Sequence, residues 1–150
     1  MSAAKSRPGL GYLVKWIERG VRMELDAALR PLEIAAPGYT ALSVLRDGRE
    51  LSSAQLARRT FVSAQAMHPI VLELERRGLV VRRGDASNAR IQLVRLSAAG
   101  RSLLAACDRA CAAAEERTFS ELSASERETL RRTLSKCVAA MGRARGRQAA

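Results

Sequence analysis

The residues Leu51–Gly78, LSSAQLARRTFVSAQAMHPIVLELERRG, predict two short helices joined by a tight turn. Ser52 and Gln55 have the spacing of a capping box, in which each side chain bonds the other residue's backbone N–H at a helix start. Ser63 is a second candidate N-cap. The second helix is predicted to end at Gly78, because glycine readily adopts the left-handed conformation that closes many helices.

The second helix has two faces of different character. Apolar residues recur with the period of a helix and predict the inward face, namely Met67, Ile70, Val71 and Leu74. The outward face then carries Ala64, Gln65, His68, Pro69 and Leu72. Because the amide of Gln65 can pair with adenine N6 and N7 in a major groove, this face suits contact with DNA. A merely solvated helix face is the alternative.

Pro69 conflicts with this helix. A proline in a helix interior lacks a backbone N–H and costs about 3 kcal/mol. The sequence leaves two interpretations, a continuous helix from Ser63 that kinks at Pro69, or a shorter helix that begins at Pro69. We favour the continuous helix, because Ser63 would otherwise cap nothing.

A basic segment with hairpin character follows, from Leu79 to Leu96. Aliphatic runs at 79–81 and 91–94 predict two strands, and the polar stretch 82–90 predicts a long tip. This tip holds Arg82, Arg83 and Arg90. Three arginines beside a helix-turn-helix indicate contact with phosphates or a minor groove. A charged tip that only keeps the hairpin soluble is the alternative.

Two helices followed by a basic hairpin have the order of a winged helix-turn-helix. The predicted fold class is mainly α with a small β-hairpin wing.

The 150 residues include 26 Lys and Arg and 15 Asp and Glu, for a formal net charge of +11. Residues 46–101 hold 11 basic and 5 acidic residues, a net +6, so the excess is concentrated in the segment suspected of binding DNA.

Over residues 38–101 the chain resembles the MarR (multiple-antibiotic-resistance regulator) family of bacterial transcription factors. The matching pieces are Leu51-Ser52, Gln55-Leu56-Ala57, Val62-Ser63, Leu74–Val80, Asp85, Arg90, Val94, and Leu96-Ser97 with Gly100. Each piece is short, and their order and spacing carry the resemblance.

The resemblance implies a dimer that a small aromatic acid or cysteine oxidation often releases from DNA. It also implies that Ser63–Leu72 is the recognition helix and Asp85–Arg90 the wing, with Arg90 reaching the minor groove. Pro69 departs from the polar or basic residue of many members, and Asn88 departs from a frequent wing acid. The residues predicted to contact double-stranded DNA are Ser52, Ser63, Ala64, Gln65, His68, Arg82, Arg83 and Arg90.

Amphipathic helices are predicted at both ends of the chain, and they exceed what the central lobe needs to cover its core. We therefore predict one subunit over 1–150, with a winged helix-turn-helix lobe at 38–97, N- and C-terminal dimerisation helices at 8–32 and 98–143, and a flexible tail at 144–150. Helices folded back in a monomer are the alternative. A two-fold homodimer predicts a pseudo-palindromic operator with its half-sites about one DNA turn apart.

The first helix carries Trp16, the only tryptophan, about one turn from Tyr12 and Arg19. In the family, the effector pocket lies between the dimer helices and the DNA-binding lobe. An aromatic wall with cations there suits a small aromatic acid. The candidate pocket residues are Tyr12, Lys15, Trp16, Arg19 and Tyr39. Aromatic packing at a helix junction, without a ligand, is the alternative.

The cysteines, Cys107, Cys111 and Cys137, are an odd set, which argues against a disulfide framework. Cys107 and Cys111 are predicted to be buried small hydrophobes rather than redox partners. No Cys and His spacing fits a metal site, and no catalytic motif is present. We expect no metal, no cofactor and no enzyme activity.

The sequence has no apolar run that could span a membrane and no signal-peptide core, so a cytoplasmic location is expected. The expected function is that of a dimeric, sequence-specific transcriptional regulator, by preference a repressor, released by a small aromatic or anionic effector. The alternative is a general architectural DNA-binding protein, in which Pro69 removes base readout and arginines hold phosphates.

Overall fold

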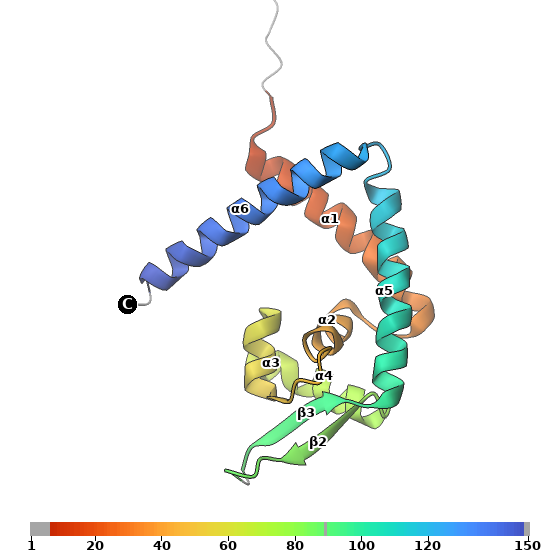
Figure 1. Cartoon of the computed structure of the whole chain (residues 1–150), viewed down its shortest axis with the longest axis vertical. Helices are drawn as coiled ribbons and strands as arrows, with labels where there is room; N and C mark the ends of the chain where they lie inside the picture. The colour runs from red at the N-terminus through yellow and green to blue at the C-terminus, as the bar shows by residue number, and fades with distance from the viewer. Residues whose placement is uncertain (1–6, 89, 149–150) are drawn as a thin grey trace, which may run out of the picture. The chain divides into compact units, whose positions relative to one another are not determined.

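Figure 1 shows the computed structural model of the chain, which describes residues 7–88 and 90–148. The chain divides after Glu115 into two units. The first contains α1 (Leu10–Leu29), a 3-10 helix (Arg30–Leu32), α2 (Ala36–Val44), β1 (Leu51–Ser52), α3 (Ser53–Thr60), α4 (Ala64–Arg76), β2 (Val80–Gly84), β3 (Gln92–Leu96) and most of α5 (Ala98–Thr118). The second contains the end of α5 and all of α6 (Ala124–Gln148). The predicted class, mainly helical with a small hairpin, is confirmed.

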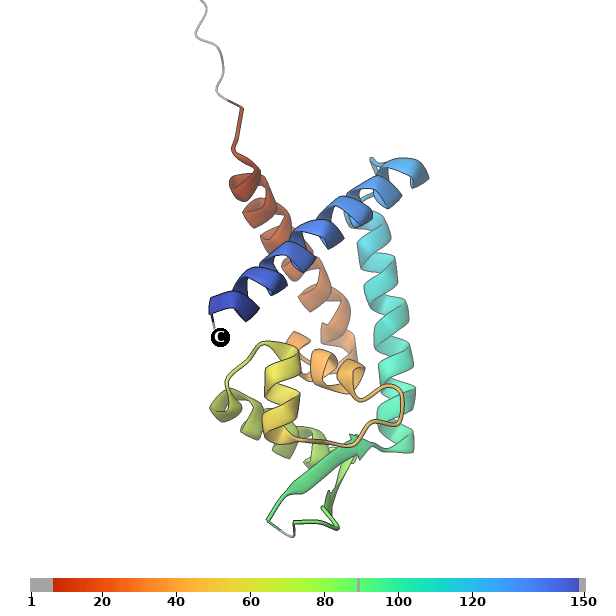
Figure 2. The same cartoon turned by 60° about the vertical axis from the view of Figure 1, so that its left-hand side comes forward.

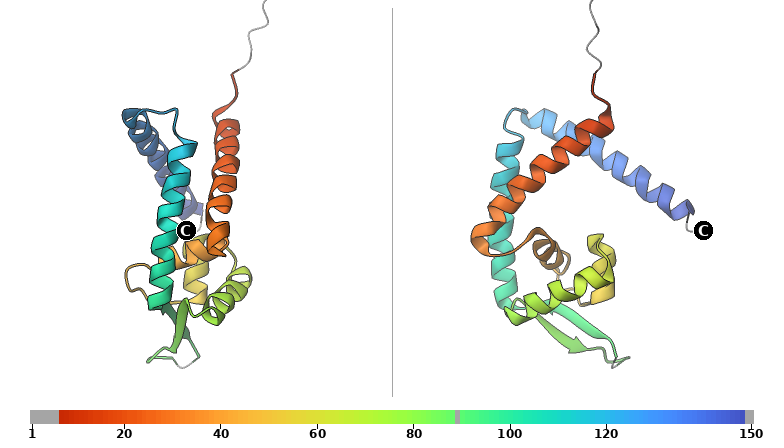
Figure 3. Two further views of the ribbon diagram at one scale, coloured as in Figure 1. Left: turned by 90° about the vertical axis from the view of Figure 1, so that its right-hand side faces the viewer. Right: turned by 180° about the vertical axis from the view of Figure 1, so that it is seen from behind.

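The three strands form one antiparallel sheet in the order β1-β3-β2. The predicted hairpin is present, and Figures 2 and 3 show it projecting beyond the helices of the lobe. The prediction that its tip begins at Arg82 was wrong. Backbone pairing continues through Arg82, Arg83 and Gly84, which lie opposite Val94, Leu93 and Gln92, so both arginines are strand residues.

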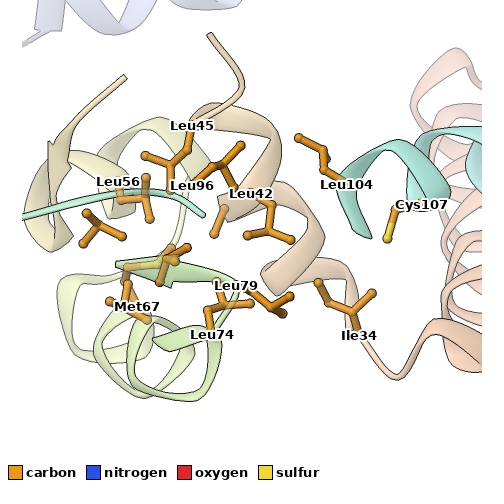
Figure 4. Packing of buried hydrophobic residues seen from close by; sticks show 14 of the residues in the cluster. Ile34, Leu42, Leu45, Leu56, Met67, Leu74, Leu79, Leu96, Leu104 and Cys107 are labelled. Atoms are coloured by element: carbon orange, nitrogen blue, oxygen red, sulfur yellow. The ribbon is translucent and has the colours of Figure 1, made fainter. Parts of the chain in front are cut away.

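One aliphatic core holds the lobe together. Figure 4 shows side chains from α2, α3, α4, both strands of the hairpin and α5 meeting in it. Leu42, Leu56 and Met67 are fully buried there. Cys107 and Cys111 are buried on α5, as predicted, and burial raises the pKa of both thiols. A buried thiol with a raised pKa is a poor nucleophile, which fits a packing role.

A serine joins the end of α4 to the start of α5. The hydroxyl of Ser97 donates to the carbonyl of Gly78 at 2.6 Å and accepts from the N–H of Gly100 at 2.9 Å. Gly78 closes α4 with a φ of +68°, the left-handed conformation predicted for it. Gly100 is buried beside the backbone of Leu79. The Ser97 and Gly100 of the family resemblance therefore have a structural function.

The two outer helices leave large apolar side chains exposed. On α1 these are Leu10, Tyr12, Leu13, Val14, Trp16, Ile17 and Met23, and on α6 they are Leu134, Val138 and Met141. The backbone of α6 is helical as far as Gln148, further than the predicted end at residue 143. Residues 143–148 include three arginines, one alanine and one glutamine, all good helix formers, and a single glycine.

Candidate nucleic-acid interface

The predicted recognition helix is α4, and it begins where the sequence predicted. The Ser63 hydroxyl accepts a hydrogen bond from the Ala66 N–H at 3.1 Å. The helix then runs without interruption through Pro69 to Arg76, which confirms a continuous helix rather than one that begins at the proline. Because Pro69 has no N–H, the carbonyl of Gln65 lacks its helical donor.

The two faces of α4 are divided as predicted. Met67, Val71 and Leu74 are buried, and Ile70 is half-buried against the core. The opposite face is exposed and consists of Ala64, Gln65, His68, Pro69 and Leu72. Within this set only Gln65 and His68 carry polar side-chain atoms. If this face reads base edges as predicted, direct readout depends on these two side chains.

Helix α3 braces α4 from the other side of the turn. The capping box is present, with the Ser52 hydroxyl accepting from the Gln55 N–H at 3.2 Å and the Gln55 side-chain oxygen accepting from the Ser52 N–H at 2.8 Å. The turn closes on Phe61, which has a φ of +58° and an exposed side chain. Contact of Ser52 with DNA stays a prediction, since its hydroxyl already holds the helix start.

Arg82 lies on the inner face of the hairpin. Successive side chains of a strand alternate between faces, so Arg82 shares its face with the buried Val80. Its guanidinium is 2.6 Å from a carboxylate oxygen of Glu75 on α4. The hydrogen bond from Arg82 lowers the pKa of Glu75. No local sequence pattern predicts this pairing, which joins a helix to a strand.

Arg83 lies on the outer face of the hairpin, with Arg95 of β3. Glu50, directly before β1, reaches both: its carboxylate is 2.8 Å from the Arg83 guanidinium and 3.8 Å from Nε of Arg95. The short β1, which the sequence did not predict, pairs with β3 and brings Glu50 to this position. The charges of Arg82, Arg83 and Arg95 are therefore partly neutralised within the chain.

Arg90 has a different environment. It is exposed, and no ion pair joins its side chain to another residue of the part of the chain that the structure describes. The tip around it is ordered by side chains: Asp85 accepts from the N–H of Ser87 at 2.7 Å, and Asn88 accepts from the N–H of Arg90 at 3.1 Å. Asn88 thus shapes the turn that carries Arg90.

The candidate pocket residues do not lie together in the single chain. Tyr12 and Trp16 contact each other on α1, with ring centroids 5.7 Å apart, and are exposed, as are Lys15 and Arg19. Leu29 lies thirteen positions after Trp16 on α1, about 20 Å further along the helix axis. Leu29 belongs to the core against which Tyr39 packs. The single chain therefore does not bring Tyr39 to the aromatic pair of α1.

Tyr39 belongs instead to a polar cluster between α2 and α5. Its hydroxyl donates to Asp108 at 3.0 Å, and the Arg46 guanidinium donates to both oxygens of the same carboxylate, at 2.6 and 2.9 Å. Burial and the hydrogen bond to Asp108 raise the pKa of Tyr39 to about 12. The Arg46 hydrogen bonds hold the pKa of Asp108 below its usual value. Sequence reasoning missed Arg46 and Asp108, which no local pattern connects.

This cluster predicts a pH dependence of stability. A carboxyl group whose folded-state pKa is lowered contributes stability above its unfolded-state pKa, and this contribution is lost as the pH falls through the folded-state pKa. Asp108→Asn is expected to lower the free energy of unfolding at pH 7 by about 1 kcal/mol, since the pair is partly exposed. The difference between the two proteins should begin to shrink below about pH 4 and disappear once the pH is below the lowered folded-state pKa of Asp108. Urea unfolding at several pH values measures this, and a constant difference would contradict it.

Residues 7–88 and 90–148 contain neither a metal-binding cluster nor a membrane-spanning helix. No group of three or more His, Cys, Asp or Glu side chains there is placed to hold a metal ion. No helix in these ranges has the length and apolar character needed to cross a membrane.

The arrangement of α3, a tight turn, α4 with an exposed face and a projecting hairpin with an arginine at its tip defines a winged helix-turn-helix protein. The sequence model of the MarR family matches residues 37–91. The HTH-type transcriptional repressor Rv2887 of Mycobacterium tuberculosis is 35% identical over 136 residues, which are 91% of this chain and 97% of that protein. The chain therefore belongs to the MarR family, whose members regulate transcription and are not an enzyme class.

Solved structures of the same mycobacterial protein are similar to this chain. One, a complex with DNA, has a TM-score of 0.76 and 32% identity, and covers 87% of this chain and 98% of that one. Another, a complex with salicylic acid, has a TM-score of 0.73 and 34% identity, and covers 88% of this chain and 98% of that one.

Proposed function

We propose that this protein is a homodimeric, sequence-specific DNA-binding repressor of transcription that a small aromatic acid releases from its operator. The observation that carries the proposal is the pairing of two exposed elements, the α4 face with Gln65 and His68 and the wing tip with Arg90. The first suits a major groove and the second the adjacent minor groove or its phosphates. The DNA complex of the mycobacterial relative supports this use of the fold.

The exposed faces of α1 and α6 support a homodimer. Trp16 is 69% exposed and Val138 also 69% exposed, and both lie among further exposed apolar side chains of their helices. Water contact with such faces is unfavourable, and a two-fold partner would remove it. The dimerisation helices are then α1, the end of α5 and α6, and a pseudo-palindromic operator follows from their two-fold axis. A regulator that acts on the chromosome is expected in the cytoplasm.

The proposed effector is a small aromatic carboxylate. The relative's complex with salicylic acid supports this class of ligand. On this chain the candidate residues are the aromatic pair Tyr12 and Trp16 and the cations Lys15 and Arg19 of α1. Since they lie far from Tyr39 in the single chain, we propose that the second subunit completes the pocket.

The proposal is tested by sequencing the genomic DNA that the purified dimer retains. We expect enrichment of a pseudo-palindromic site whose half-sites are centred about 34–36 Å apart, one turn of B-DNA. Enrichment without a shared sequence would contradict specific recognition. A single half-site bound by one chain would contradict the dimer.

Release by an effector is tested on that operator. Salicylate is expected to lower operator affinity and to raise the thermal midpoint of the free protein, since a ligand that binds the folded state stabilises it. Trp16→Ala should remove both effects of salicylate. Cyclohexane carboxylate, which lacks the aromatic ring, is the matched control. A panel of aromatic acids that changes neither quantity would exclude this part of the proposal.

A further inference from the structure

We infer that the ion pair between Glu75 and Arg82 is a positioning device, which sets the angle of the wing against the recognition helix. Arg82 then acts on DNA recognition through Glu75 rather than by touching DNA, contrary to its prediction as a contact residue. This inference rests on the proposed function.

The pair joins the two elements that the proposed function assigns to DNA. Glu75 lies in the last turn of α4, and Arg82 lies in the middle of β2. Their charged atoms are 2.6 Å apart, and their side chains are 34% and 31% exposed. A charge-assisted hydrogen bond of this kind is short and directional, so it restrains the orientation of one element relative to the other.

Arg82 is also the last side chain of β2 that can make such a link. The inner face of β2 consists of Val80, Arg82 and Gly84, because side chains alternate along a strand. Val80 is buried in the core, and Gly84 has no side chain. Beyond Arg82, this face of β2 therefore has no further side chain to offer the helix, and the wing tip with Arg90 extends from that point.

The direction in which Glu75→Gln changes operator affinity distinguishes a positioning role from a purely electrostatic one. Removing a negative charge from a DNA-binding surface should strengthen its attraction to phosphates. If Glu75 positions the wing, Glu75→Gln should instead weaken operator binding, by about fivefold for a coupling of ordinary size. Binding to a scrambled duplex should not fall, because it does not require a particular wing angle.

A double-mutant cycle tests whether the effect passes through the wing tip. Glu75→Gln in an Arg90→Ala background should cause no further loss of operator affinity. The wing angle matters only through the contact that Arg90 makes, and that contact is already absent in this background. Additive losses would overturn the inference, since they would place the two residues in independent roles.

The charge swap separates positioning from direct contact. Arg82→Glu alone should weaken operator binding, and the double variant Arg82→Glu with Glu75→Arg should recover it to within about threefold of the wild type, because the ion pair is restored with reversed polarity. If Arg82 touches a phosphate or a base, the swapped variant stays as weak as Arg82→Glu, and the inference fails.

The chain offers a matched control two residues away. Glu73 lies on the same helix and bonds Arg76 of that helix at 2.7 Å, so it does not connect α4 to the wing. Glu73→Gln should leave operator affinity unchanged or slightly raised. An equal loss in Glu73→Gln and Glu75→Gln would show that any carboxylate of α4 has this effect, and would overturn the inference.

Two measurements distinguish a loss of wing positioning from unfolding of the variant or from a side effect of the substitution. Equal thermal midpoints for the wild type and each variant exclude unfolding, and Glu75→Asp, which keeps the charge, should recover part of the operator affinity. A wild-type protein without any preferred site would refute the proposed function itself. A wild-type protein that binds its site, together with Glu75→Gln that binds it as well or better, would refute only the positioning inference.

Discussion

Arg90→Ala is expected to reduce operator affinity by about 10- to 100-fold, more than alanine at any other predicted contact residue. The reason is the distribution of charge on the hairpin. Arg82, Arg83 and Arg95 lie against Glu75 and Glu50, whereas Arg90 has no carboxylate partner in the described part of the chain. In the proposed complex its guanidinium therefore contacts DNA without first breaking an ion pair.

Fluorescence anisotropy over a range of salt concentrations measures this effect. Loss of one phosphate or minor-groove cation should also reduce the slope of log affinity against log salt by about 1. Arg83→Ala is the matched control, an arginine of the same hairpin held by Glu50, and should cost much less. Gln65→Ala tests the recognition helix. If it costs far more affinity than Arg90→Ala, the wing is not the main contact.

Gly100→Ala is expected to lower the free energy of unfolding by about 3 kcal/mol or more, the upper end of overpacking effects. A Cβ at this position would lie 1.9 Å from the carbonyl oxygen of Leu79 and 3.2 Å from a Leu96 methyl group. The obstacle is backbone rather than a flexible side chain. It can yield only if α5 moves away from Leu79, which would also break the hydrogen bonds of Ser97.

Gly20→Ala is the control for this substitution. Gly20 is also helical, and a Cβ there would meet nothing within 4 Å in the described residues. Alanine should stabilise this helix by about 0.5–1 kcal/mol relative to glycine. Thermal unfolding at one fixed protein concentration compares the variants, because the midpoint of a dimer depends on concentration. A Gly100→Ala protein as stable as the wild type would contradict the close packing of α5.

Local signals in the sequence predicted the parts of the fold that depend on neighbouring residues. The capping residues Ser52 and Ser63, the buried face of α4 and the stop at Gly78 all follow from contacts within a few positions. The predicted helix was continuous through Pro69 for the same reason, since the cap at Ser63 needs a helix to follow it.

The ion pairs could not be predicted, because they depend on the tertiary fold. Glu50 meets Arg83 only after β1 has paired with β3, and β1 is two residues long, too short for an alternating pattern. Arg46 and Asp108 are 62 residues apart. Arg82 and Arg83 were predicted to lie at the hairpin tip, whereas backbone pairing makes both of them strand residues. Because side chains alternate along a strand, the two arginines lie on opposite faces.

Pro69 gives the alternative function its strongest support. It occupies the middle of the exposed face of α4, where it offers DNA no hydrogen-bond donor. With base reading left to Gln65 and His68, an architectural protein that holds DNA mainly by phosphates is the competing account. The two accounts differ in one measurable quantity, the preference for a particular sequence.

Competition binding at a fixed salt concentration tests the central claim most directly. A labelled duplex carrying the selected site is displaced either by the same unlabelled duplex or by a scrambled duplex of equal length and composition. A sequence-specific repressor should bind its own site at least about 10³-fold more tightly than the scrambled one. Displacement at equal concentrations by both duplexes would contradict the account and support the architectural alternative.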